Sequence, residues 1–179
     1  MSKNNHDFKA LREEMKKQNG IEKIPQLKEL LNAEDSLIPS LVKKQDIEKL
    51  EELALTCNLI ANIIGTIIDA YTEGPCASDL RSPANENKQK DKSDRENLLK
   101  IRNNCYFNIG LIHKEKGNTM DALLYFYDAF RLSENKSISW QKDNLLYKAE
   151  IEIKNLLGSK SGTYDSLKKI KKPKRIIIK

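Results

Sequence analysis

The segment that most constrains the fold is YFNIGLIHKEKGNTMDALLYFYDAFRLSE, residues 106–134, where apolar and small residues recur at helical spacing on both sides of a glycine. This spacing predicts two short helices joined by Lys116, Gly117 and Asn118. Gly117 suits the left-handed backbone that ends a helix, and Asn118 or Thr119 can cap the helix that follows. The residues predicted to face one another are Tyr106, Ile109, Gly110 and His113 on the first helix and Ala122, Leu123, Phe126 and Ala129 on the second. Because the small residues in this set let two backbones approach closely, we expect an antiparallel helical hairpin.

A stretch of the chain at about 103–136, which contains these residues, resembles one tetratricopeptide repeat, a unit of about 34 residues with the pattern W-x2-L-G-x2-Y, then A-x3-F, then P. The matching positions are Tyr106, Ile109, Gly110, Ala122, Phe126 and Ala129. The departures are His113 at the Tyr position and Glu134 at the closing Pro. The resemblance covers roughly a fifth of the chain. It implies an α-solenoid fold of antiparallel helical hairpins, and it implies partner binding rather than catalysis, because such repeats almost never carry chemistry themselves.

A single repeat cannot bury its own hydrophobic face, so neighbouring helices are required. Trp140 and Tyr147 repeat the aromatic frame of the hairpin one repeat length further on, but no second A-x3-F follows them. We therefore expect residues 139–157 to form a terminal capping helix with one polar face. Upstream, residues 44–75 match the pattern at only a few positions and form at best a degenerate repeat.

The chain is predicted to be all-α, because seven Gly and five Pro in 179 residues are too few for many short strands. Composition and periodicity divide it into five segments. They are a polar N-terminal segment (1–20), a helical unit that is a possible degenerate repeat (21–74), a flexible insertion (75–97), the hairpin with its capping helix (98–157) and a basic tail (158–179). The insertion is expected to be flexible because it has almost no large apolar residue, and the tail is expected to be disordered because its dense like charges repel.

Residues 53–68 of the N-terminal unit, LALTCNLIANIIGTII, form a run of sixteen residues without a charge. They belong to a helix predicted to begin at Asp46. The run is shorter than the roughly 20 residues that span a membrane, and its asparagines make it less apolar. We therefore predict a helix that is buried by packing on both sides. Asn58 and Asn62, four residues apart on one face, either hydrogen-bond a partner peptide or form a capped or water-facing stripe.

The C-terminal tail holds the excess of positive charge, since seven of its last twelve residues are Lys or Arg and the formal net charge of the chain is +6. The basic positions of interest are Lys168, Lys169, Lys171, Lys172, Lys174 and Arg175. Residues 171–175 resemble a short nuclear-localisation signal, which would make a nuclear location possible. The same charges can bind anionic lipid, with isoleucines 176–178 as an apolar contact, or the phosphates of nucleic acid. A tail that only improves solubility also remains open.

The chain shows no recognisable arrangement of residues for catalysis. Of its two histidines, His6 lies in the polar N-terminal segment, and His113 occupies a position where the repeat has a packed ring. No glycine-rich phosphate-binding motif and no C-x-x-C pair occurs, and Cys57, Cys76 and Cys105 are odd in number and far apart. We therefore predict a protein that is not an enzyme and that needs no metal or cofactor. The cysteine pattern and the lack of an apolar signal segment favour a reducing, cytoplasmic location.

The resemblance also indicates where a partner would bind. In tetratricopeptide proteins the inner face of each repeat's first helix usually lines a groove for an extended peptide or a partner helix. The corresponding residues of this chain are Asn104, Phe107, Asn108, Leu111, Lys114 and, one repeat further, Lys142. Asn108 and Lys142 match positions that grip a C-terminal carboxylate in members that bind heat-shock chaperones, but the acidic upstream positions would repel a carboxylate. For Phe107 and Leu111, packing against the upstream helix remains open.

The sequence thus predicts a non-catalytic protein-interaction module, an adaptor, scaffold or assembly factor, that binds a peptide or helix of another protein. Two alternatives remain open. The first is a small chaperone for a secreted or assembling client, although such a chaperone would be expected to have three regular repeats. The second is an accessory protein that acts on nucleic acid or a membrane surface through the basic tail.

Overall fold

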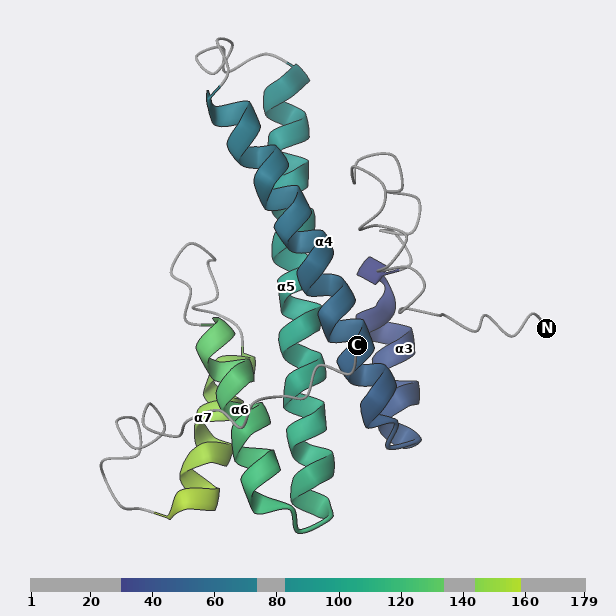
Figure 1. Cartoon of the computed structure of the whole chain (residues 1–179), viewed down its shortest axis with the longest axis vertical. Coiled ribbons are helices and arrows are strands. Elements are labelled where there is room, and N and C mark those ends of the chain that lie inside the picture. Colours follow the sequence, from purple (N-terminus) through teal and green to yellow (C-terminus); the bar gives the residue numbers. More distant parts are fainter. Residues whose placement is uncertain (1–29, 74–82, 134–143, 159–179) are drawn as a thin grey trace, which may run out of the picture. The chain divides into compact units, whose positions relative to one another are not determined.

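The computed structural model describes residues 30–73, 83–133 and 144–158, and all regular secondary structure within these ranges is helical. The helices are α3 (Ala33–Lys43), α4 (Ile47–Glu73), α5 (Pro83–Glu115), α6 (Thr119–Ser133) and α7 (Asn144–Leu157). Since no strand occurs among the described residues, the prediction of an all-α protein is confirmed for them (Figure 1). The chain divides into two compact units, Met1–Cys105 and Tyr106–Lys179. The predicted polar segment (1–20) and the basic tail beyond Gly158 lie outside the described residues.

The first unit is built around α4, and Asp46 determines where this helix starts. The Asp46 Oδ1 accepts a hydrogen bond from the backbone N–H of Lys49 at 3.1 Å, which is the capping interaction of a helix N-terminus. The predicted start of this long helix is therefore confirmed. Gln45, with a positive φ of 52°, turns the chain between α3 and α4, and the two helices pack together. Their buried apolar residues include Ile38 and Leu41 of α3 and Leu50, Leu53 and Ile60 of α4.

Residues 83–97 differ from the predicted flexible insertion, because they form the first turns of α5. The segment has few large apolar residues, but it is rich in Lys, Glu, Gln and Arg, which have high helix propensity. It is also attached to α4, since the Arg95 Nε donates a hydrogen bond to the backbone oxygen of Ala61 at 3.2 Å. Leu98, directly after the segment, has no exposed surface and anchors the helix. The remainder of the predicted insertion, residues 75–82, lies outside the described part of the chain.

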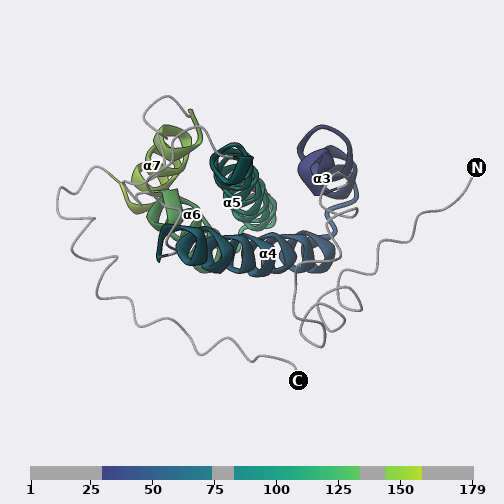
Figure 2. The ribbon, with the colours of Figure 1, turned by 90° about the horizontal axis from the view of Figure 1, so that it is seen from above.

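The uncharged run, residues 53–68, lies within α4 and is buried on one side only. Ala54, Cys57 and Ala61 have no exposed surface, whereas Leu55 is 47 % exposed. In Figure 2, α3 and residues 83–105 of α5 lie on the same side of α4. The prediction that packing buries the run on both sides is therefore wrong, because the two neighbouring helices of this unit leave its other side open. None of the helices in the described ranges combines the length and the apolar character that a membrane span needs.

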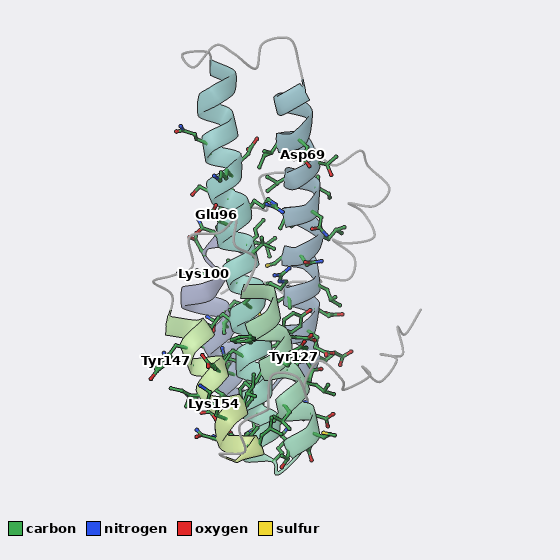
Figure 3. All side chains as sticks on the ribbon, turned by 90° about the vertical axis from the view of Figure 1, so that its left-hand side faces the viewer. Asp69, Glu96, Lys100, Tyr127, Tyr147 and Lys154 are labelled. Atoms are coloured by element: carbon green, nitrogen blue, oxygen red, sulfur yellow. The ribbon has the colours of Figure 1, made fainter. Side chains whose placement is uncertain are left out.

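The second unit contains residues 106–115 of α5 together with α6 and α7. The turn from α5 to α6 is where the sequence predicts it, and Gly117 has the left-handed φ of 76°. Helix α6 packs against α7, whose inner side carries the buried Ala149 and Ile153. The exposed side of α7 carries the polar residues Lys148, Lys154 and Asn155, and also the Tyr147 side chain, which is 64 % exposed and extends away from the helix (Figure 3).

Candidate protein-binding surface

Close packing of α5 against α6 depends on Gly110 and Phe126. A Cβ atom added to Gly110 would lie 2.7 Å from two ring carbons of Phe126, so the helices approach too closely for any side chain at this position. The ring of Phe126 has no exposed surface, and its centroid lies 5.4 Å from that of Phe107. Ala122 and Ala129 are buried on the same helix. The residues predicted to face one another in the hairpin therefore include Gly110 and Phe126, which pack directly against each other.

His113 is a packed residue of the hairpin. Its ring is stacked on that of Tyr125, with centroids 5.3 Å apart and planes 9° from parallel. The Nδ1 atom lies 3.9 Å from the Asp121 Oδ2 and 3.5 Å from the Asn118 Nδ2. The ring therefore packs against α6 beside the turn between the two helices.

The predicted partner-binding residues of α5 separate into a buried and a partly exposed group. Phe107 packs on Phe126 inside the hairpin and has only 9 % of its surface exposed, so we leave it out of the candidate surface. Asn108 and Leu111 are half-buried and Lys114 is exposed. These three residues follow one another at intervals of three and share one side of α5. We refer to them as the α5 surface.

Asn104 is half-buried and precedes Asn108 by one helical turn, but it belongs to the first unit and is not part of the α5 surface. The other predicted residues lie outside the described part of the chain. They are Lys142 and the basic-tail residues Lys168, Lys169, Lys171, Lys172, Lys174 and Arg175. Their roles stay predictions.

Lys114 forms an ion pair that joins the end of α5 to α7. Its Nζ lies 2.5 Å from the Glu152 Oε2, and the Glu152 side chain is the more buried of the two. Because the carboxylate neutralises the lysine, this end of the α5 surface presents a charge pair rather than a single cation. A surface of this kind is poorly suited to gripping the C-terminal carboxylate of a peptide.

A polar cluster in the first unit is not predicted by the sequence patterns. Arg102 of α5 is only 6 % exposed, and its Nη1 donates a hydrogen bond to the Asn58 Oδ1 at 2.5 Å. Its Nε donates to the Oδ1 of Asn103, which has no exposed surface, at 3.1 Å. The Asn58 side chain thus binds within the chain, where the sequence left binding of a partner peptide open. Asn62, four residues further on, is exposed. No local pattern could reveal this cluster, because Asn58 and Arg102 are 44 positions apart.

The Cys57 thiol lies beside this cluster and has no exposed surface. Burial raises the pKa of this thiol from 9.0 to about 12, and the positive charge of Arg102 opposes the rise only in part. Cys105 is also a buried free thiol. Since the thiolate is the reactive form of cysteine, both residues are placed for packing rather than for chemistry.

We expect the Cys57 thiol to resist alkylation in the folded protein. At pH 8 a thiol with a pKa of about 12 is ionised in roughly one molecule in ten thousand. Iodoacetamide should therefore modify Cys57 slowly in buffer and rapidly in urea, as followed by mass spectrometry of a Cys76→Ser variant. Equal modification rates in buffer and in urea would contradict the buried placement.

The raised pKa of the Cys57 thiol also means that the folded state keeps this proton to a higher pH than the unfolded chain does. The free energy of unfolding should therefore fall as the pH rises from about 9 toward 12.

Within the described ranges, no three His, Cys, Asp or Glu side chains are grouped so that they could hold a metal ion. Comparison of the chain with protein-family models, curated proteins and solved structures finds no match.

Proposed function

We propose that this chain is a non-catalytic protein-interaction module that binds a peptide or helix of another protein on the α5 surface. The observation that carries the proposal is the approach of Gly110 to Phe126, where an added Cβ would lie 2.7 Å from the ring. These residues are the Gly and the Phe of the tetratricopeptide pattern. The resemblance to a partner-binding repeat is thus supported by a contact as well as by sequence spacing.

The composition of the α5 surface suggests what kind of peptide it takes. Leu111 offers a partly exposed apolar contact, and the half-buried Asn108 beside it adds a polar side chain. Apolar area with a few polar groups that fix orientation is typical of binding sites. Lys114 is paired with Glu152, so the peptide is recognised by its side chains and backbone rather than by a C-terminal carboxylate.

A catalytic role has less support than a binding role. His113 is stacked on Tyr125, and the thiols of Cys57 and Cys105 are buried. General acid–base or nucleophilic catalysis needs such groups to reach a substrate. The proposal therefore assigns no reaction to the chain.

Affinity capture with the full-length chain from a lysate of the source cells tests the proposal. The Asn108→Ala, Leu111→Ser double variant should recover about tenfold less of a specifically captured protein, because losing central interface contacts costs about 1–2 kcal/mol. Met120→Ser is the matched control, since Met120 is 62 % exposed at the start of α6, and it should capture as much as the unaltered chain. Thermal melting followed by circular dichroism verifies that both variants fold. The proposal fails if nothing is captured specifically, or if both variants lose the captured protein equally.

A further inference from the structure

A second exposed feature is the side of α7 that faces away from α6. Tyr147 is 64 % exposed and Ile151 is 36 % exposed, and the two residues lie one helical turn apart on the same side. The buried residues Ala149 and Ile153 occupy the opposite side of the helix. The Tyr147 side chain extends away from α7 (Figure 3). We call Tyr147 and Ile151 the α7 outer patch, an apolar surface that the described helices leave exposed.

The chain changes direction at Gly158, the residue that follows α7. Its φ of 72° is left-handed, the conformation that commonly ends a helix. Gly117, with a φ of 76°, ends the preceding long helix α5 with the same conformation. The helix after Gly117 then packs back on α5 through the contact of Phe126 with Gly110. The conformation of Gly158 allows the chain after α7 to reverse in the same way.

The sequence beyond Gly158 contains the signals of one short amphipathic helix. It continues for 21 residues (179 − 158), and the segment in question is TYDSLKKIKK, residues 163–172. Ser161 is suited to capping its start, Asp165 lies in its first turn, and Pro173 follows its end. Its apolar residues recur at every third position and therefore share one side of a helix. They are Tyr164, Leu167 and Ile170.

We propose that residues 163–172 form a helix that docks antiparallel on the α7 outer patch. Its apolar side would pack on Tyr147 and Ile151. A helix of ten residues is about 15 Å long, and the part of α7 from Tyr147 to Gly158 is about 16 Å long, so the two match in length. Residues 159–162 suffice for the connection, since only three residues join α5 to α6. This site goes beyond the proposed function of the α5 surface and does not depend on it.

Two arguments favour this segment over another molecule as the occupant. A segment joined to α7 by four residues is present at the patch at an effective concentration of about a millimolar, which a separate partner rarely reaches. The segment also needs a surface, because its four lysines repel one another and a helix of ten residues is marginal in water. Among the exposed large apolar residues of the described ranges, Tyr147 and Ile151 are the nearest to it in the sequence.

Cross-linking from position 147 in the purified full-length chain identifies the occupant. Tyr147 is replaced by a photoreactive phenylalanine derivative, and Met120, which is 62 % exposed on α6, is replaced in the same way for comparison. Mass spectrometry should locate the cross-link from position 147 in residues 163–172 of the same molecule. A mixture of isotope-labelled and unlabelled chains distinguishes this product from a link between two copies. The proposal is overturned if the link joins two copies, or if position 147 reaches residues 163–172 no more often than position 120 does.

Hydrogen exchange tests whether the contact holds residues 163–172 in a helix. In the unaltered chain, their backbone amides should exchange at least about tenfold more slowly than in a free peptide of the same sequence. The Tyr147→Ser, Ile151→Ser double variant should remove this protection, because both residues of the α7 outer patch lose their apolar surface. Lys148→Ser is the matched control, since Lys148 is an exposed residue of the same helix, and it should keep the protection.

The same experiment shows when the docking proposal is wrong. Exchange at the peptide rate in the unaltered chain would overturn it, and so would protection that survives the double variant or is lost equally in Lys148→Ser. Thermal melting followed by circular dichroism verifies that the variants fold. Because these substitutions leave the α5 surface unaltered, failure here leaves the proposed function standing.

Discussion

Replacing Arg102 with alanine is expected to lower the free energy of unfolding by about 3–5 kcal/mol. The guanidinium is only 6 % exposed, and it donates to the Oδ1 atoms of Asn58 and Asn103 at 2.5 Å and 3.1 Å. Truncation removes both donors and leaves the fully buried Asn103 acceptor without this bond, which costs about 1–3 kcal/mol for such a group. It also opens a cavity between α4 and α5. Urea denaturation followed by circular dichroism measures the loss.

Arg95→Ala is the matched control for Arg102→Ala. Arg95 is an arginine of the same helix that also reaches α4, but it is half-buried and donates a hydrogen bond to the backbone oxygen of Ala61 at 3.2 Å. Its loss should cost about 0.5–1.5 kcal/mol. Hydrogen exchange should show the larger effect of Arg102→Ala in α4 and in residues 83–105. If the two variants cost the same, the Arg102 cluster contributes no more than a half-exposed hydrogen bond.

Phe126→Ala is expected to destabilise the second unit by about 3–5 kcal/mol, the usual cost of removing a fully buried aromatic side chain. Phe126 has no exposed surface, and its ring fills the space between Gly110 and the ring of Phe107. The backbone at Gly110 has no side chain that could move into the cavity. Urea denaturation and hydrogen exchange of α6 and of residues 106–115 measure this effect.

Gly110→Ala tests whether the contact with Phe126 is the reason for this cost. In an open helix, alanine is more favourable than glycine by about 1 kcal/mol, but overpacking against a buried ring costs about 1–3 kcal/mol. We expect overpacking to dominate, because the added Cβ would lie 2.7 Å from a ring that has no free space. Gly65→Ala is the control and should be nearly neutral, since its Cβ would lie 3.1 Å from the long Arg95 side chain. In the Phe126→Ala background the Gly110→Ala penalty should disappear, and a penalty that remains would mean that another contact causes it.

Features that depend on neighbouring residues could be predicted from the sequence. The turn at Gly117 and the start of α4 at Asp46 follow from the backbone preference of glycine and from a local capping bond. The contact of Gly110 with Phe126 also follows from the sequence. These two residues are only 16 positions apart, and the short turn between their helices fixes how the helices are aligned.

Features that depend on distant residues could not be predicted. The helix over residues 83–97 was missed because it has few apolar residues, whereas its stability comes from helix propensity and from the contact of Arg95 with Ala61. The burial of Arg102 was missed because its partner Asn58 lies on another helix.

The candidate α5 surface could be predicted only in part. Periodicity correctly indicates which residues share a side of α5, but it cannot show which of them the neighbouring helices cover. Phe107 was assigned to the groove by its position in the repeat, and its ring packs on Phe126 instead. The pairing of Lys114 with Glu152 was also unforeseen, because it joins residues 38 positions apart.

The uninterrupted course of α5 restricts how this protein can be dissected. The boundary between the two compact units, after Cys105, falls inside this helix rather than in a connection between helices. A gene truncated there would produce fragments with a severed helix, and the backbone groups at the cut would lose their intrahelical partners. Each fragment would also lack part of the α5 backbone that continues its own helix. Deletion mapping of binding activity would therefore confuse loss of folding with loss of a site, and point substitutions in the whole chain are the better tool.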